Sequence, residues 1–324
     1  MIRAFFLQAL LMAPIAQAAD LTETADDTQE LEPISVVGQR VANLQPASTY
    51  ATLATALRYD PQVNLQTRGI PEGQADVTIR GGLFENTGFR MGAVTVFDPQ
   101  TGHYSAEAPI DPAMLNSPEI LTDFENGLNA FNASVATIHY GFNPISQGGH
   151  FSGGVGTDSL LYAGARLSGV KTLAGGRSMG ATISASASRG DGTLADGDHE
   201  FKRISAHLQS IGSHGETNFL LGYHDKFAGW PGMYTGFSSL PETDHTKLGL
   251  ALINHRWSND NGWLEVGGAY RWLDDDYDFD RRSVEAGSPG SFEHETRSFS
   301  LGLTGQQQAG ELEWTLSLIH ISEP

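Results

Sequence analysis

The sequence predicts a small α+β domain followed by an antiparallel transmembrane β-barrel, and the barrel is incomplete in this chain. The first observation is a long alternation of apolar and polar side chains after about residue 156, the period of strands with one apolar and one wet face. The second is that tight turns alternate with long polar loops between these segments. The third is an export signal at the start of the chain.

Residues 1–18 have the three parts of a secretory signal peptide. Arg3 supplies the basic start, residues 4–15 form an apolar core, and Ala16-Gln17-Ala18 has the small residues of a cleavage site. We therefore expect the mature chain to start at Ala19. The apolar core is too short to span a bilayer, and no later stretch reaches about eighteen apolar residues, which excludes a helical membrane protein.

Composition excludes further classes of function. The chain contains no cysteine, so neither a disulfide framework nor a thiolate metal site can form. The formal net charge of −19 argues against nucleic acid as a partner, because phosphates would be repelled. The histidines are scattered, and no Ser/His/Asp signature, Gly-x-Ser-x-Gly, His-Glu-x-x-His or phosphate-binding loop occurs, so we expect no enzyme.

Residues 19–40 are predicted to be a flexible tether that ends in a short pairing segment. Between residues 20 and 32 the chain is acidic and almost free of large apolar side chains, so it cannot bury enough surface to offset the entropy of ordering. A β-prone run follows Pro33 and consists of Ile34, Ser35, Val36, Val37 and Gly38. Such an isolated run is suited to pair with the sheet edge of another protein, and the alternative is that it is the first strand of the following domain.

Residues 41–150 are predicted to form a compact mixed domain. Residues 49–58 place apolar side chains at helical spacing, and this helix is expected to end before Asp60-Pro61. Residues 77–80 and 93–97 are predicted strands, each stopped by a turn. A helical turn at residues 112–115 and a strand at residues 118–124 complete the predicted elements.

Residues 151–316 are predicted to be barrel strands. In residues 182–188 Thr and Ser alternate with Ile and Ala, and later segments alternate in the same way. Tight turns at residues 212–215, 259–262 and 309–310 alternate with longer loops at residues 190–198, 228–244 and 281–290. The alternative is a soluble β-sandwich, but strands of more than about ten residues with Trp and Tyr near their ends favour the barrel.

The last predicted strand ends at Leu318, after about eight strands in all. Because a sheet edge inside a bilayer must be paired, we expect the chain to be a fragment of a longer protein. Residues 317–324 are expected to break the strand alternation, and they resemble translated sequencing-adapter sequence, so a non-native tail is predicted there.

The order of tether, pairing segment, mixed domain and barrel resembles that of the TonB-dependent outer-membrane receptors, over most of the mature chain. Ile34-Ser35-Val36-Val37-Gly38 looks like their TonB box, which in the family pairs as a strand with the inner-membrane protein TonB. Residues 76–82 are similar to the Ile-Arg-Gly segment of the family's plug domain, and Tyr140-Gly141 with Gly148-Gly149 resembles the motifs that end the plug. The resemblance implies that residues 41–150 are a plug that blocks the barrel lumen.

Two departures from the family pattern indicate a divergent subfamily. The family commonly has Asp-Gly after the strand that corresponds to residues 93–97, and this chain has Asp98-Pro99. It also commonly has Arg-Gly-Pro soon after an Ile-Glu-Val-Leu strand, whereas Glu119-Ile120-Leu121 continues into Thr122-Asp123 here. The class of ligand therefore does not carry over from the family.

In the family's plan, the outward loops of the plug meet the ligand. The expected ligand-binding residues are Phe84, Asn86, Gln100, His103 and Tyr104, because amides beside aromatic faces suit a large polar chelate or corrinoid. The alternative is that these loops only pack against the barrel wall. Arg80 is expected to pair with an acidic side chain of the barrel, since a buried guanidinium needs a partner.

An acidic segment, residues 274–280, is predicted to lie at the mouth of a long loop. Clustered carboxylates suit Ca²⁺, and the cobalamin receptors of this family are similar in binding calcium through loop aspartates. Asp274, Asp276 and Asp278 are therefore candidate calcium ligands, and no other cofactor is expected. The spacing does not match an EF-hand loop, and the alternative is a solvated acidic loop.

The resemblance implies an active transporter in the outer membrane of a Gram-negative bacterium, importing a large scarce ligand such as a ferric siderophore or cobalamin. Its expected partners are TonB, outer-membrane lipid and the metal-chelate or corrinoid ligand, and a monomer is expected. One alternative is a passive or structural barrel, such as a porin or adhesin, without energy coupling. Another is a soluble exported β-rich binding protein.

Overall fold

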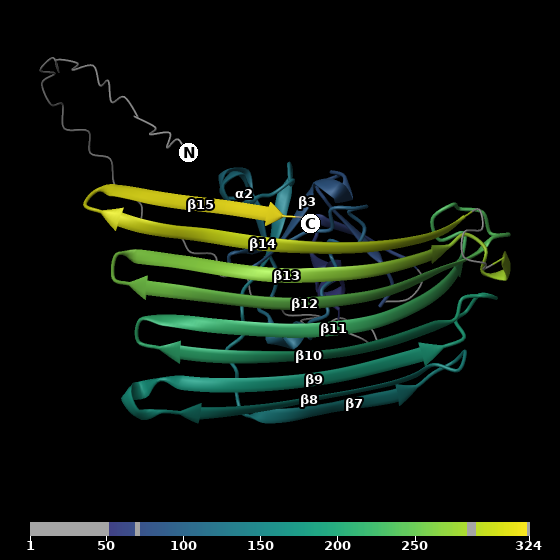
Figure 1. Ribbon diagram of the computed structural model, residues 1–324, viewed down its shortest axis with the longest axis horizontal. Helices are drawn as coiled ribbons and strands as arrows, with labels where there is room; N and C mark the ends of the chain where they lie inside the picture. Colours follow the sequence, from purple (N-terminus) through teal and green to yellow (C-terminus); the bar gives the residue numbers. More distant parts are fainter. Residues whose placement is uncertain (1–51, 69–71, 284–289, 323–324) are drawn as a thin grey trace, which may run out of the picture. The chain divides into compact units, whose positions relative to one another are not determined.

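A computed structural model describes residues 52–68, 72–283 and 290–322. The described chain has two parts: short elements up to residue 140, and long strands from residue 148 onward (Figure 1). The TonB-box residues predicted at 34–38 lie outside the described residues.

The first part is a mixed α+β domain, which we call the plug. Its elements are α1 (Leu53–Ala56), η1 (Leu57–Tyr59), β1 (Val63–Thr67), β2 (Ala75–Ile79), η2 (Phe84–Asn86), β3 (Thr87–Met91), β4 (Val94–Val96), η3 (Pro112–Met114), β5 (Glu119–Thr122), α2 (Asp123–Asn129) and β6 (Ala136–Tyr140). β1 and β2 form an antiparallel pair. β4, β3, β6 and β5 form a second sheet in that order, in which β3 and β6 run parallel.

Local sequence signals explain where the first plug elements begin and end. Thr52 and Thr55 form a reciprocal capping box, so α1 begins at Leu53. The helix continues as a 3-10 turn and closes before Pro61, as predicted. β2 ends at Ile79 because Arg80 and Gly81 adopt positive φ values of 49° and 76°, which a strand cannot continue.

The second part is one antiparallel sheet of nine strands in which each strand pairs with its neighbours in sequence (Figure 1). The strands are β7 (Gly148–Val155), β8 (Leu161–Thr172), β9 (Ser178–Gly190), β10 (His199–Gly212), β11 (Gly215–Pro231), β12 (Pro241–Asn259), β13 (Gly262–Asp278), β14 (Ser291–Ala309) and β15 (Leu312–Ser322). The 3-10 turns η4 (Ala174–Gly176) and η5 (Arg281–Ser283) lie in connections between them. β7 thus begins inside the predicted boundary of the plug at residue 150.

The connections give the sheet two different rims. Tight turns at residues 213–214, 260–261 and 310–311 define the short-turn rim. The connections after β9, β11 and β13 are longer and define the long-loop rim. Both sets were predicted from the sequence, although β11 and β12 extend further into the predicted loop at residues 228–244 than expected.

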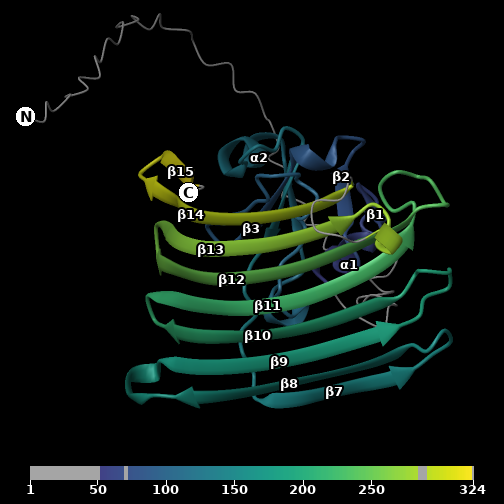
Figure 2. The ribbon, with the colours of Figure 1, turned by 45° about the vertical axis from the view of Figure 1, so that its right-hand side comes forward.

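The long strands turn a largely polar face toward the plug, interrupted by buried leucines of β11 and β12, and an apolar face away from it. In β9 the side chains of Thr182, Ser184 and Ser188 are buried, whereas Ile183 between them is exposed. The Ser184 hydroxyl donates a hydrogen bond to Asp111 of the plug. This alternation, with the plug against one face of the sheet, is the arrangement of a barrel wall around a filled lumen (Figure 2).

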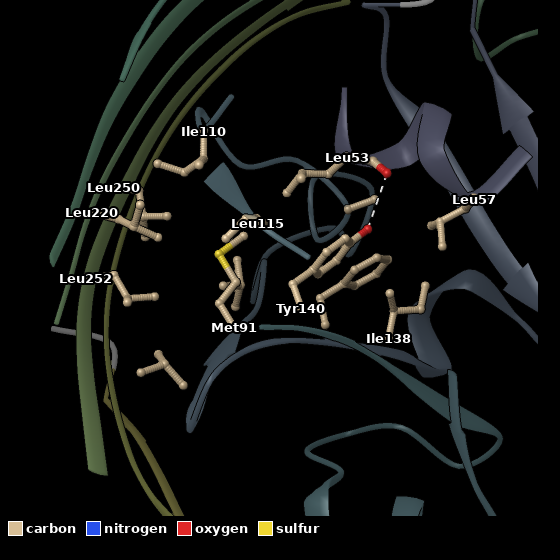
Figure 3. Packing of buried hydrophobic residues seen from close by; sticks show 14 of the residues in the cluster. Leu53, Leu57, Met91, Ile110, Leu115, Ile138, Tyr140, Leu220, Leu250 and Leu252 are labelled. Carbon is tan, nitrogen blue, oxygen red and sulfur yellow. Dashed lines mark hydrogen bonds between the residues drawn. The ribbon is translucent and has the colours of Figure 1, made fainter. Parts of the chain in front are cut away.

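Plug and sheet share one buried hydrophobic core. Met91, Ile110 and Leu115 of the plug lie opposite Leu220, Leu250 and Leu252 of β11 and β12 (Figure 3). Deeper in the plug, Tyr140 Oη donates a 3.2 Å hydrogen bond to the carbonyl oxygen of Leu53. The plug is therefore held to the wall by apolar packing as well as by polar contacts.

The predicted end of the last strand is wrong. β15 pairs with β14 through Ser322, and its alternation of exposed and half-buried side chains continues beyond Leu318. The reason is that Ser317, Ile319 and Ile321 fall on the same, inner face, so the ladder is not interrupted. The assignment of residues 317–324 as a non-native tail stays a prediction.

Candidate functional site

The candidate site lies where the plug loops meet the long-loop rim. Its centre is a series of neighbouring rings that we call the rim aromatic row: Phe84, His103, Tyr234, Tyr277, Phe292 and His294. Two of the rings come from the plug, one from the β11–β12 loop, and three from β13 and β14. The row thus joins segments that are far apart in the sequence.

The rings follow one another at contact distances. Phe84 stacks on His103 with centroids 4.5 Å apart, and His103 is 5.7 Å from Tyr234. Tyr234 meets Tyr277 edge-on at 5.1 Å. The cross-strand pair of Tyr277 and Phe292 is nearly parallel at 6.1 Å, with an interplanar angle of 17°. Such spacings are typical of interacting aromatic side chains.

Carboxyl groups fix the tyrosines of this region. Tyr104 Oη, beneath the row, donates to Asp244 Oδ1 at 3.2 Å and to Asp275 Oδ1 at 2.9 Å. Tyr234 Oη donates to Asp244 Oδ2 at 3.3 Å, and Tyr277 Oη donates to a carboxyl oxygen of Glu242 at 2.9 Å. Burial raises the pKa of Tyr104 well above its usual value and the nearby Asp244 raises it further, so this phenol remains a donor.

Asp76 is the centre of a second network, on the plug side. Its carboxylate accepts from Arg68 Nη2 at 2.7 Å and lies 2.8 Å from His103 Nδ1. Burial alone would raise the pKa of Asp76, but hydrogen bonds from His103, Gln74 and Arg68 outweigh it and hold the pKa below its usual value. Arg68 also donates to the carbonyl of Met233 at 2.6 Å, which ties the plug to the β11–β12 loop.

A buried ion pair lies beneath these loops. Lys226 Nζ of β11 lies 2.5 Å from Glu107 Oε1 of the plug, and both side chains are buried. Burial raises the pKa of Glu107, and the neighbouring Lys226 ammonium opposes this effect. Arg271 of β13 donates to the carbonyl of Tyr104 at 3.0 Å. The plug segment that carries His103 and Tyr104 is thereby anchored to two barrel strands.

The structure brings together some of the residues predicted to bind ligand. Phe84 and His103 belong to the rim aromatic row, and Gln100 is exposed nearby, where its Oε1 accepts a hydrogen bond from Thr296 of β14. Tyr104 is only 4% exposed and acts as an anchor below the row. Asn86 ends η2 and is half-buried, with its backbone N–H bonded to Leu83. That these residues bind ligand stays a prediction.

Sequence reasoning missed the barrel half of the row. Tyr234 could have been predicted as a site residue, because it lies within a predicted long loop next to a sequence of turn residues. Tyr277, Phe292 and His294 had no usable signal, since strand alternation gives the face of a residue but not its height along the wall.

The charged side chain of Arg80 is placed differently from expectation. Arg80 is exposed, and its Nε donates to the side chain of Gln62 within the plug at 2.9 Å, so the expected pairing with a barrel acid is wrong. The reason is the positive φ at the end of β2, which leaves Arg80 in the turn that follows the strand.

The acidic segment is strand rather than loop. Asp274, Asp276 and Asp278 belong to the last part of β13, directly before the long connection to β14, so the predicted position at a loop mouth is confirmed, although the three residues are in strand conformation. Pairing with β12 and β14 keeps the backbone extended, which spaces alternate carboxylates by about 7 Å instead of folding them around an ion. Within the described residues, no group of three or more His, Cys, Asp or Glu side chains could hold a metal ion, and the calcium prediction gains no support.

The described part of the chain contains no helix long and apolar enough to cross a membrane. No protein-family model matches the sequence, and no curated protein matches it either.

Comparison with solved structures defines the class. The chain has the fold of a TonB-dependent receptor, an α+β plug followed by part of an antiparallel barrel, as the sequence predicted. It is similar to the ferric yersiniabactin uptake receptor FyuA from Yersinia pestis, with a TM-score of 0.62 and 14% identity over 83% of this chain and 45% of that one.

Two further structures agree. BauA, the ferric preacinetobactin receptor from Acinetobacter baumannii, gives a TM-score of 0.61 at 14% identity over 85% of this chain and 44% of that one. The ferric citrate transporter FecA gives 0.60 at 13% identity over 85% and 45%. The chain therefore spans less than half the length of these receptors, and at this identity the likeness concerns the fold.

Proposed function

We propose that this chain supplies the plug and the first barrel strands of an active outer-membrane transporter that imports a scarce metal chelate. One observation carries the proposal: the plug shares a buried hydrophobic core with the face of the sheet that is turned toward it, in the cluster that holds Ile110 and the leucines of β11 and β12. A passive pore has no use for a domain that fills its lumen.

The energy source follows from the same arrangement. A plug held by apolar packing and by the buried pair of Lys226 and Glu107 does not leave a lumen without work. In the proposed mechanism, TonB pairs as a strand with Ile34 to Val37 and pulls on the plug from the periplasm. The proposed location of the protein is then the outer membrane of a Gram-negative bacterium.

The ligand is proposed to be an iron chelate or a molecule of similar size. The names of FyuA, BauA and FecA describe receptors or transporters of ferric complexes. In this chain the rim aromatic row and Gln100 offer ring faces and an amide to a large polar ligand. Nothing in this arrangement requires chemistry on the cargo, so the proposed activity is transport alone.

Deleting Ile34 to Val37 from the whole receptor tests the proposal. We expect the deletion to abolish uptake of iron-55 chelates or labelled cobalamin and to leave binding at the cell surface intact. The control is a deletion of equal length in the tether, residues 22–25, which keeps the box. Unchanged uptake after loss of the box would favour a passive or structural barrel.

A Val36→Cys substitution gives a second readout, because this chain supplies no competing thiol; any cysteine in the rest of the whole receptor is replaced by serine first. We expect this thiol to crosslink to a cysteine in TonB, and more strongly when ligand is bound.

A further inference from the structure

The rim aromatic row has an exposed end on β14. Phe292 is 48% exposed, and the neighbouring His294 ring is nearly parallel to it, at 13° and 6.3 Å. Tyr277 and Tyr234 continue the row inward and are half-buried. The exposed end of the row is therefore accessible to a ligand that enters the rim.

Hydrogen bonding makes two of these rings electron-rich. Tyr277 donates its phenol proton to Glu242, and Tyr234 donates to Asp244. A phenol that donates to a carboxylate gains electron density, which makes its ring face more negative and a better partner for a cation.

The charges around the row have one predominant sign. Four carboxyl groups are in direct hydrogen-bond contact with its rings: Asp76, Glu242, Asp244 and Asp275. The guanidinium of Arg68 is in contact with the row and already pairs with Asp76. Two more guanidinium groups of this rim are likewise paired, Arg281 with Asp198 and Arg282 with Asp280. An anion would meet repulsion here and a cation attraction.

The molecule itself already places a cation on this row. The guanidinium carbon of Arg68 lies 4.5 Å from the centroid of the Tyr234 ring. This is the geometry of a cation–π contact, and such contacts gain strength where water is partly excluded.

We propose that the rim aromatic row binds a cationic group of the imported ligand, so that the receptor prefers a chelate bearing an ammonium over an anionic chelate of the same shape. This inference rests on the proposed transport function and names the charge class of its ligand. The ring faces make the contact with the cationic group. The carboxyl groups behind the rings make the surroundings negative, so that a cation is preferred over an anion.

A matched pair of probes tests the charge preference. One is a ferric trihydroxamate chelate with a free ammonium, and the other is the same chelate with that ammonium succinylated to a carboxylate. Equilibrium dialysis of the iron-55 complexes against the whole receptor in detergent gives both dissociation constants. We expect the ammonium chelate to bind about tenfold more tightly, and raising the salt concentration to reduce the ratio.

Substitutions of aromatic residues test whether the charge preference arises at the rim aromatic row. Phe292→Leu should reduce the ratio of the two dissociation constants about threefold, whereas Phe292→Tyr should retain it. Phe237→Leu, an exposed phenylalanine of the β11–β12 loop outside the row, is the matched control and should change nothing. A ratio that Phe292→Leu leaves unchanged would contradict the assignment to the row.

If neither chelate binds, two small aromatic ions test the charge preference instead. Saturation-transfer NMR with benzyltrimethylammonium and benzenesulfonate should then show contact for the cation alone. Equal signals, a stronger signal for the sulfonate, no signal for the cation, or tighter binding of the succinylated chelate would each overturn the inference. These binding measurements need no TonB, so a failed box-deletion experiment would overturn the transport function and leave this result standing.

Discussion

At the scale of single residues, Asp76 holds the plug side of the candidate site together. Its carboxylate pairs with Arg68 and His103, and all three side chains border the long-loop rim. Asp76→Asn should leave these donors poorly satisfied and reduce local stability by about 1–3 kcal/mol. We expect faster amide exchange at β1 and β2 in hydrogen-exchange mass spectrometry of the whole receptor. Glu85→Gln, the same change at an exposed carboxyl group, should have no such effect.

The same carboxylate predicts an acid dependence. Because its partners hold the pKa of Asp76 below the unfolded value of about 3.9, the stabilisation is complete above that value. It is lost as the pH falls through the lower, folded pKa. The protection factors of the β2 amides, which are exchange rates corrected for the intrinsic effect of pH, should therefore fall more in acid in the wild type than in Asp76→Asn. Equal acid dependence in the two proteins would show that another group titrates.

These residues also show how far the sequence could predict the site. Phe84 and His103 were predicted because the family resemblance places their loops on the outward side of the plug, and their rings stand beside amides in the sequence. Tyr104 was assigned to the same loop correctly, but its burial depends on Asp244 and Asp275, more than a hundred residues away. A contact of that separation is set by strand register, and no local pattern in one sequence reports it.

At the scale of elements, the plug approaches the barrel wall so closely at one glycine of β11 that a side chain there would collide with the plug backbone. A Cβ at Gly222 of β11 would lie 2.2 Å from the carbonyl oxygen of Pro109. Gly222→Ala should push residues 105–115 of the plug off the wall at a cost of about 1–3 kcal/mol. Limited proteolysis of the whole receptor should then cleave this segment faster.

Gly169→Ala is the matched control for this prediction. Gly169 also lies within a strand, β8, and a Cβ there would meet nothing within 4 Å. Equal protease resistance of the two variants would mean that the wall at Gly222 yields without displacing the plug.

Elements were predictable where their pattern is local and periodic. The long strands alternate along their length, so β9 to β14 and their turns follow from the sequence. β3 is buried along its whole length at the centre of the plug sheet, so it shows no alternation and escaped prediction. β5 was predicted, but α2 directly after it was not, because Gly127 and two Asn within it are poor helix formers.

At the scale of the whole molecule, the outer face of the sheet is apolar from strand to strand. Exposed side chains on this face include Ile183, Ile204, Leu221, Ile253, Leu264 and Leu301. In water a face of this kind would promote association, whereas in a bilayer it is the expected lipid contact. The proposed outer-membrane location therefore makes a quantitative prediction about single charges on this face.

The cost of a charge should depend on its depth. Leu301 is 59% exposed near the middle of β14, and Leu264 is 41% exposed close to the short-turn rim. In phospholipid vesicles, Leu301→Arg should lower the free energy of unfolding by about 2–4 kcal/mol, because the guanidinium would lie near the bilayer midplane. Leu264→Arg should cost only about 0–1 kcal/mol, since its charge reaches the interface. Urea titration of the folded whole receptor measures both. Costs near zero at both positions would mean that this face lies outside lipid, and the proposed outer-membrane location would be wrong.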